Sequence, residues 1–349
     1  MLLRLSVLIT VVILVAGGCS QSEDTTSDAS SPTTTAAAPS STTTTTPATT
    51  SATSAAITPT SEEPESVNVA ADLSYRINDS ALAAIDVYHS TEAKGGPVVV
   101  LFHGEDVEKH SLYYPSLATA IAERGAVVFA PNWRGRGSPD LETGSADNDR
   151  ASCAVSYALA NAAEFGADPE TLVLFGHSGG ASAAAMVGVH DATPIDDCAV
   201  EMTPFVADRM VLVEGDWLLG GDMEDADDLP QLLEITTPWT WLTDAPTMPV
   251  TLVTTAGAKR TYTRCGVTDA VSTFWVRDPD GWFRERLDAF DALDDGCMDI
   301  EEATTVLAGA MEEHGFDATE LFLEDSAHLG LSDEDQEVLV DTILGTTGA

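Results

Sequence analysis

The sequence predicts an α/β fold in which a mostly parallel sheet of eight strands is covered by helices on both faces. Beyond Val67, short β-branched runs alternate with longer helical stretches, a rhythm typical of parallel strands joined by helical crossovers. One of these runs, 171–175, leads directly into a glycine-rich turn and a helix of small residues. The 349 residues are 44% apolar, which is enough for a large core.

The expected elements follow one another without a break in the pattern. Strands are predicted at about 70–77, 83–88, 97–102, 126–130, 171–175, 209–213, 249–254 and 320–323, the first two having the weakest pattern. Helices are predicted near 113–124, 148–165, 179–189, 300–314 and 334–344. We therefore expect one domain, residues 67–349, with long excursions after the sixth and seventh strands.

The N-terminus has the pattern of an export signal. Arg4 is followed by an apolar stretch, 5–16, that is too short to span a bilayer, and then by Gly17-Gly18-Cys19. This resembles a bacterial lipoprotein signal peptide, so residues 1–18 are expected to be removed and Cys19 to be lipidated. An ordinary secretory signal is the alternative. A lipoprotein signal predicts an extracytoplasmic protein that is anchored to the cell membrane by lipid, whereas an ordinary secretory signal predicts a secreted protein.

A low-complexity segment, residues 19–66, precedes the domain. From Ser20 to Ser66, 26 of 47 residues are Ser or Thr, a composition that cannot build a core and is typical of a disordered spacer. We expect a flexible stalk that holds the domain away from the membrane.

Export also determines what the cysteines are expected to do. Besides Cys19, the chain has Cys153, Cys198, Cys265 and Cys297, which mature outside the reducing cytosol and are expected to form two disulfides. Three pairings are possible, and the local ones, Cys153 with Cys198 and Cys265 with Cys297, are favoured.

The charge excludes one class of partner. The chain has 15 basic and 57 acidic side chains and a formal charge of −42, so nucleic acid would be repelled. An anionic membrane surface would not attract it either, which leaves the lipid anchor as the only predicted membrane contact. The oligomeric state stays open.

The strongest motif is Gly-x-Ser-x-Gly at residues 176–180. It directly follows a buried strand and opens a helix, the context in which a serine sits on a strained turn with its hydroxyl exposed. Ser178 is therefore the predicted nucleophile. The backbone N–H of Gly179, at the start of the helix, is a predicted oxyanion donor.

A second oxyanion donor is expected from the loop after the third strand, His103-Gly104-Glu105. The backbone N–H of Glu105 is the predicted donor, and His103 is expected to order this loop.

The base should come from the last loop, because enzymes whose nucleophilic serine lies on this kind of strand-to-helix turn have the chain order serine, acid, histidine. His328, five residues after the last strand, fits this position. For the acid, Asp295 stands 33 residues before His328 and shortly before a helix, and Asp269 is the first carboxylate after the seventh strand. Asp295 is preferred and Asp269 is the main alternative. Asp294, Asp278 and, after the sixth strand, Asp216 stay possible.

These motifs together resemble the α/β-hydrolase superfamily, and within it the dienelactone-hydrolase and feruloyl-esterase-like carboxylesterases. Narrower similarities are Ile85-Asp86-Val87-Tyr88 before the His-Gly loop, the segment 149–176 before Ser178, and Pro131-Asn132-Trp133-Arg134-Gly135 after the fourth strand. The resemblance implies a serine hydrolase of carboxylic esters, acting through an acyl-enzyme on a small-molecule or polymer-attached ester. It implies neither a metal nor an organic cofactor. Alternatives are a serine peptidase or amidase on the same fold, and a non-catalytic binding lipoprotein.

Overall fold

The structure is a computed structural model that describes residues 66–78, 83–91, 94–105, 107–134, 141–189, 195–215, 242, 246–259, 263–265 and 297–346. The chain divides into two units, Met1–Pro59 and Thr60–Ala349, and all described residues lie in the second. The predicted signal peptide, Cys19 and all of the stalk except its last residue lie outside the described residues. In the described part, no helix has the length and apolar character needed to cross a membrane.

Eight strands form one sheet in the order β1-β2-β4-β3-β5-β6-β7-β10. They are β1 (Val67–Ser74), β2 (Ala84–Ser90), β3 (Gly96–Phe102), β4 (Val127–Pro131), β5 (Ala167–His177), β6 (Arg209–Val213), β7 (Pro249–Thr255) and β10 (Asp317–Leu323). Strand β2 is antiparallel to both of its neighbours, and all the other pairs are parallel. The predicted mostly parallel, eight-stranded sheet is confirmed, with β1 beginning three residues earlier than expected.

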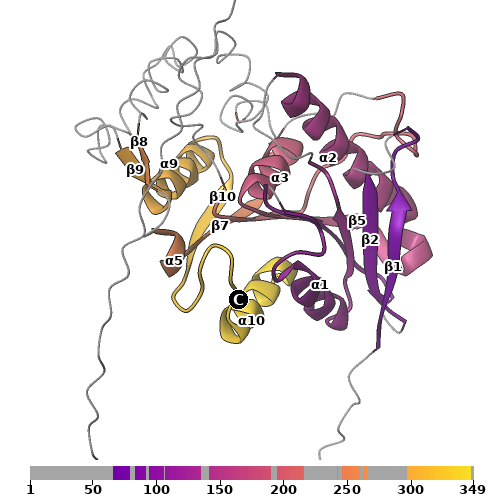
Figure 1. The fold of residues 1–349 in the computed structure, drawn as a ribbon, viewed down its shortest axis with the longest axis horizontal. Coiled ribbons are helices and arrows are strands. Elements are labelled where there is room, and N and C mark those ends of the chain that lie inside the picture. Colours follow the sequence, from indigo (N-terminus) through magenta and orange to yellow (C-terminus); the bar gives the residue numbers. More distant parts are fainter. Residues whose placement is uncertain are drawn as a thin grey trace, which may run out of the picture. The chain divides into compact units, whose positions relative to one another are not determined.

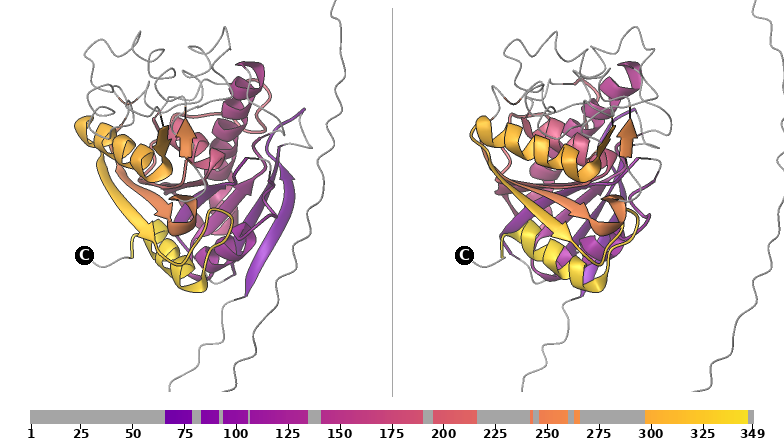
Figure 2. Two further views of the ribbon diagram at one scale, coloured as in Figure 1. Left: turned by 60° about the vertical axis from the view of Figure 1, so that its left-hand side comes forward. Right: turned by 90° about the vertical axis from the view of Figure 1, so that its left-hand side faces the viewer.

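Helices cover both faces of this sheet, as predicted (Figures 1 and 2). They are α1 (Tyr114–Glu123), α2 (Leu141–Asn161) with the 3-10 turn η1 (Ala162–Phe165), α3 (Gly179–Val189), the short α5 (Ala256–Lys259), α9 (Ile300–Glu313) and α10 (Asp333–Leu344). Helices α1 and α10 lie on one face, and α2, α3 and α9 lie on the other (Figure 1).

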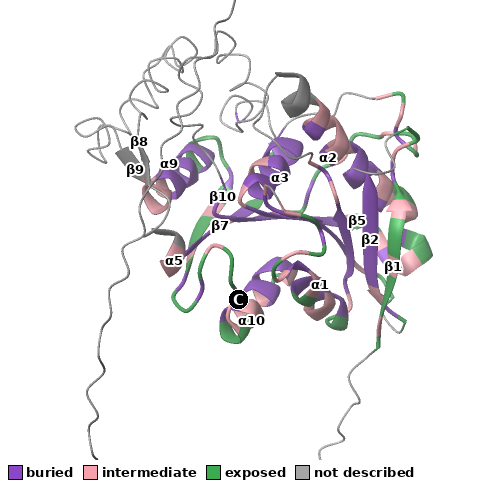
Figure 3. Ribbon diagram, viewed as in Figure 1, coloured by how far each residue is buried: buried purple, intermediate pink, exposed green. Residues whose placement is uncertain are grey.

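The alternation of side chains along the strands explains why two cores exist. Val98, Val100 and Phe102 of β3 pack into the cluster under α2, α3 and α9. Val99 and Leu101 point to the opposite face and pack with α1 and α10, as the two-residue period of a strand requires. The central strands are buried, whereas β1 and β10 at the two edges of the sheet carry exposed residues (Figure 3).

Capping residues define where the last two long helices begin. The Asp299 side chain accepts from the N–H of Glu302, whose own side chain accepts from the N–H of Asp299, so α9 opens with a complete capping box. Ser332 caps α10 by accepting from Asp335, and Gly345 ends this helix with φ of 71°. Helix α10 therefore begins only after the loop 324–332, which contains His328.

One of the two favoured disulfides is present among the described residues. Cys153 of α2 is bonded to Cys198, which lies between α3 and β6, as predicted. A two-stranded ladder that the sequence did not predict, β8 (Thr263–Cys265) and β9 (Cys297–Asp299), places Cys265 directly opposite Cys297. The backbone register is thus compatible with the second predicted pairing.

Candidate active site

Ser178 lies at the sharp turn between β5 and α3. Its φ is 55°, a left-handed conformation that costs a non-glycine residue roughly 1–2 kcal/mol. The turn is held because the N–H of Ser178 donates to the carbonyl of Val213 (2.8 Å) and its carbonyl accepts from Ala181 (2.9 Å). The predicted strained turn is confirmed, and strain held this firmly is typical of a functional position.

The two glycines of the motif are required by space. A Cβ on Gly176 would stand 2.1 Å from the carbonyl oxygen of Gly180. A Cβ on Gly180 would stand 2.3 Å from the carbonyl oxygen of Phe102. Helix α3 therefore packs directly against the ends of β5 and β3, which brings Ser178 next to the loop that follows β3.

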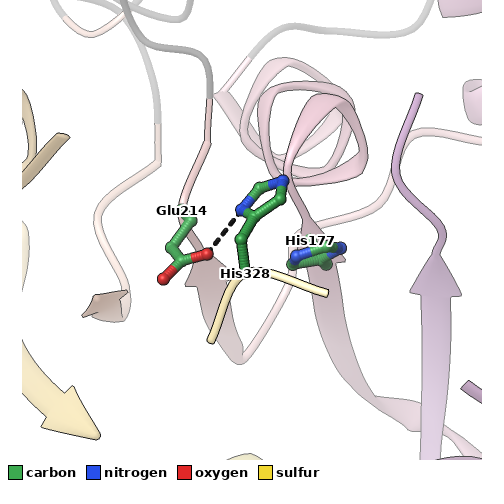
Figure 4. Close-up of side chains that lie close together, drawn as sticks. All are labelled: His177, Glu214 and His328. Carbon is green, nitrogen blue, oxygen red and sulfur yellow. Dashed lines mark hydrogen bonds and ion pairs between the residues drawn. The ribbon is translucent and has the colours of Figure 1, made fainter. Parts of the chain in front are cut away.

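His328 lies in the loop between β10 and α10, where it contacts a buried glutamate. Its Nδ1 is 2.6 Å from Oε2 of Glu214 (Figure 4), and the exposed fractions of the two side chains are 10% and 0%. With Nδ1–H donating to this carboxylate, Nε2 is the nitrogen that can accept a proton. The pair therefore has the arrangement of a general base and the acid that orients it.

Glu214 is fixed at both oxygens. It follows β6 directly, with φ of 49°, and its backbone N–H donates to the carbonyl of Val253 (2.9 Å). Its Oε1 accepts from the N–H of Thr255, the last residue of β7 (2.7 Å). A buried carboxylate needs such partners, and here they aim its second oxygen at His328.

Glu214 therefore occupies the place that the sequence analysis assigned to Asp295 or Asp269. Those two residues, and the further candidates Asp294, Asp278 and Asp216, lie outside the described residues. Nδ1 of His328 is already bonded to Glu214. Glu214 therefore replaces Asp295 and Asp269 as the candidate acid. The signal that could have found Glu214 was its place as the first carboxylate after the sixth strand.

A neutral histidine lies beneath the base. The rings of His177 and His328 are 4.6 Å apart between centroids, and His177 is only 1% exposed. Burial, followed by the charge of His328, lowers the pKa of His177 to about 3. His177 therefore places no positive charge beside the base near neutral pH.

Tyr114 links this histidine to the loop after β3. The N–H of Gly104 donates to the Tyr114 hydroxyl (2.8 Å), and the hydroxyl donates in turn to Nδ1 of His177 (2.7 Å). This chain of hydrogen bonds ties the loop to the end of β5, next to Ser178.

The cluster His177, Glu214 and His328 also brings together atoms that could bind a metal, within 4.8 Å of one another. The separation of 2.6 Å between His328 Nδ1 and Glu214 Oε2 is, however, that of a charge-assisted hydrogen bond. Nδ1 of His177 is bonded to Tyr114. The geometry of these described residues is thus that of a hydrogen-bonded site.

The proposed oxyanion donors lie side by side. The backbone nitrogen of Glu105 is 3.5 Å from the position that a Cβ on Gly179 would take. His103 orders the loop, as expected: it is 2% exposed, its Nδ1 is 2.7 Å from the carbonyl oxygen of Gly104, and its carbonyl accepts from the Trp133 indole. Burial lowers the pKa of His103 to about 4, so it is neutral near pH 7.

A buried ion pair anchors the next part of this loop. The ammonium of Lys109 is 1% exposed and pairs with the buried Asp86 of β2 and with Asp72 of β1 (2.7 Å to the latter). The backbone N–H of Lys109 donates to the Asn132 side chain (3.0 Å). Because a buried ammonium is stable only with such partners, the loop is held firmly against β1 and β2.

Comparisons with known proteins agree with this architecture. Residues 85–215 match the BD-FAE family model. Esterase B from Lactobacillus rhamnosis HN001 is similar in structure, with a TM-score of 0.54, 14% identity, and coverage of 81% of this chain and 88% of that one. The propionate-bound esterase Est2 of Thermogutta terrifontis is also similar, with a TM-score of 0.53, 19% identity, and coverage of 83% of this chain and 97% of that one.

A truncated carbohydrate esterase from gut microbiota gives a TM-score of 0.56 at 13% identity, covering 83% of this chain and 99% of that one. The comparison with the curated proteins found no match. The resemblance to the α/β-hydrolases is thereby confirmed in the fold: residues 85–215 match the BD-FAE model, and the described residues have the α/β-hydrolase fold.

Proposed function

We propose that this protein is an extracytoplasmic serine hydrolase that cleaves carboxylic esters through an acyl-enzyme. The observation that carries the proposal is the hydrogen bond between His328 and the buried Glu214, in a fold that holds Ser178 on a strained turn. The match to the BD-FAE model and the likeness to solved esterases support the same chemistry.

The proposed reaction uses three side chains and two backbone groups. Nε2 of His328 takes the proton of Ser178 as its Oγ attacks the ester carbonyl, and Glu214 stabilises the resulting imidazolium. The N–H groups of Gly179 and Glu105 bind the oxyanion, each contributing on the order of 10²–10³ in rate. His328 then returns the proton to the leaving alcohol. Water, activated by the same histidine, hydrolyses the acyl-serine to the free acid.

The proposed location rests on the N-terminal sequence and the cysteines. We infer removal of residues 1–18, lipidation of Cys19, and a stalk up to residue 66. The Cys153–Cys198 bond supports maturation outside the cytosol. The bond between Cys265 and Cys297 stays a prediction, which peptide mapping without reductant tests. Free thiols at these two positions would contradict it.

Hydrolysis of p-nitrophenyl acetate and butyrate by the full chain tests the proposed activity, with Ser178→Ala and His328→Ala as variants whose folding is checked by circular dichroism. We expect each variant to lose at least about 10³-fold in kcat. A fluorophosphonate should label the wild type and fail to label Ser178→Ala.

The two alternatives give different results. If the wild type neither hydrolyses these esters nor reacts with the fluorophosphonate, the proposed function is wrong and a binding lipoprotein is favoured. If the fluorophosphonate labels Ser178 but only amide or peptide substrates are cleaved, the protein is a peptidase or amidase on the same fold.

A further inference from the structure

The proposed oxyanion hole contains an acidic side chain. Glu105, whose backbone N–H is a proposed donor, has its Cβ 3.3 Å from the position of a Cβ on Gly179, the other donor. Its carboxylate is about one third exposed. Negative charge develops at this place during ester attack, and an unneutralised carboxylate nearby would slow the reaction by on the order of 10–10²-fold.

An arginine from a different part of the chain lies close to both donors. Nη2 of Arg134, three residues after β4, donates to Oε1 of Glu105 (2.6 Å). Nη1 of the same guanidinium is 3.4 Å from the position of a Cβ on Gly179. Arg134 thus pairs with Glu105 and lies close to Gly179, and its side chain is only 13% exposed.

A second carboxylate lies near the guanidinium. Its Nε is 3.6 Å from Oδ2 of Asp147 on α2, and the other oxygen of Asp147 is 2.6 Å from Arg150. Two positive and two negative side chains thus lie in one network. The exposed fractions of Arg134 and Asp147 are 13% and 9%, so this side of the network is mostly shielded from water, where ion pairs are screened less than at the surface.

We propose that Arg134 is a positioning residue of the oxyanion hole, which acts through Glu105 by neutralising its carboxylate. This inference rests on the proposed function. It assigns the Glu105–Arg134 ion pair a role that an ordinary surface ion pair does not have, because the pair lies where the charge of the transition state develops. Removing Arg134 alone then takes a positive charge away from the Glu105 carboxylate, whereas removing both partners removes the carboxylate charge as well.

The test is a double-mutant cycle on the full chain with p-nitrophenyl butyrate, comparing Arg134→Met, Glu105→Gln and the double variant. We expect Arg134→Met to lower kcat by about 10–10²-fold and to change KM less than about threefold. Glu105→Gln keeps the backbone N–H and removes the carboxylate charge, so it should lower kcat less than Arg134→Met does. The double variant should regain at least fivefold in kcat over Arg134→Met, and Arg134→Lys should keep more activity than Arg134→Met.

Arg124→Met is the matched control, because Arg124 pairs with Glu337 and Asp341 of α10 and contacts none of these residues. Its kcat should stay within about twofold of the wild type. A kcat of Arg134→Met equal to that of an active wild type would overturn the inference while leaving the proposed function intact. A double variant with a kcat equal to or below that of Arg134→Met would also overturn the inference, because a merely structural role predicts this result. An inactive wild type that does not react with a fluorophosphonate would overturn both proposals.

Discussion

The substitution Glu214→Gln tests the assignment of the acid most directly, because the structure limits how glutamine can be oriented there. The carboxylate accepts from the N–H of Thr255 through Oε1 and from His328 through Oε2. If the amide oxygen keeps the bond to Thr255, the amide NH₂ faces Nδ1 of His328. The imidazole must then accept at Nδ1 and carry its proton on Nε2, which is the wrong tautomer for a base.

The opposite orientation is also unfavourable. It would place the amide NH₂ against the N–H of Thr255, two donors facing each other in a buried site. Since Glu214 is fully buried, no water can relieve this contact cheaply. We therefore expect the wrong tautomer to dominate, with a loss in kcat on the order of 10⁴-fold, about 5 kcal/mol.

The assay is steady-state hydrolysis of p-nitrophenyl butyrate, with folding checked by circular dichroism and thermal unfolding. Asp295→Asn and Asp269→Asn serve as controls, because both were candidates for the same role, and their kcat should stay within about threefold of the wild type. If Glu214→Gln keeps more than about a tenth of the wild-type kcat while Asp295→Asn or Asp269→Asn abolishes activity, the assignment is refuted.

Three further predictions concern stability. Replacing Cys153 and Cys198 by serine should lower the free energy of unfolding by about 2–4 kcal/mol in urea denaturation, because a 45-residue loop is no longer closed; an unchanged denaturation midpoint would contradict this. The pKa of His177 is about 3 in the folded protein and 6.5 in the unfolded chain. The unfolded chain therefore binds more protons as the pH falls from about 6.5 toward 3, and the protein loses stability over this range. The variant His177→Asn keeps an acceptor for Tyr114. It should reduce the slope of unfolding free energy against pH by up to about 1.4 kcal/mol per pH unit. An unchanged slope would argue against a buried neutral His177. Gly180→Ala should lower the melting temperature and abolish ester hydrolysis, because its Cβ would stand 2.3 Å from the carbonyl oxygen of Phe102. A variant as stable as the wild type would instead show that α3 can shift.

Several features of the fold could be predicted because they are encoded in contiguous residues. The strand, turn and helix around Ser178 occupy a single stretch, and the glycines at 176 and 180 stand where the structure allows no side chain. The order of strands and helices followed from their period, and the position of His328 followed from its place after the last strand. Even there, the boundaries shifted, as for β1, which begins at Val67.

The orienting acid could not be predicted in this way. Glu214 and His328 are 114 residues apart in the sequence, and they meet only because β6, β7 and β10 lie side by side and end at the same edge of the sheet. The spacing argument that favoured Asp295 assumed that the acid follows the seventh strand, whereas the geometry places a carboxylate after the sixth.

The sequence by itself thus determined the fold class, the strained turn at Ser178 and the loop that carries His328, since local patterns and spacing specify them. It favoured the Cys153–Cys198 bond among three possible pairings, and the structure shows this bond. Only the tertiary structure decided that Glu214 is the partner of His328 and that Arg134 lies on Glu105. Both contacts join segments that are distant in the sequence. The chain has so many carboxylates that the sequence around each of them does not show which one is paired. The pairing is therefore decided by which strand ends and loops the sheet brings together.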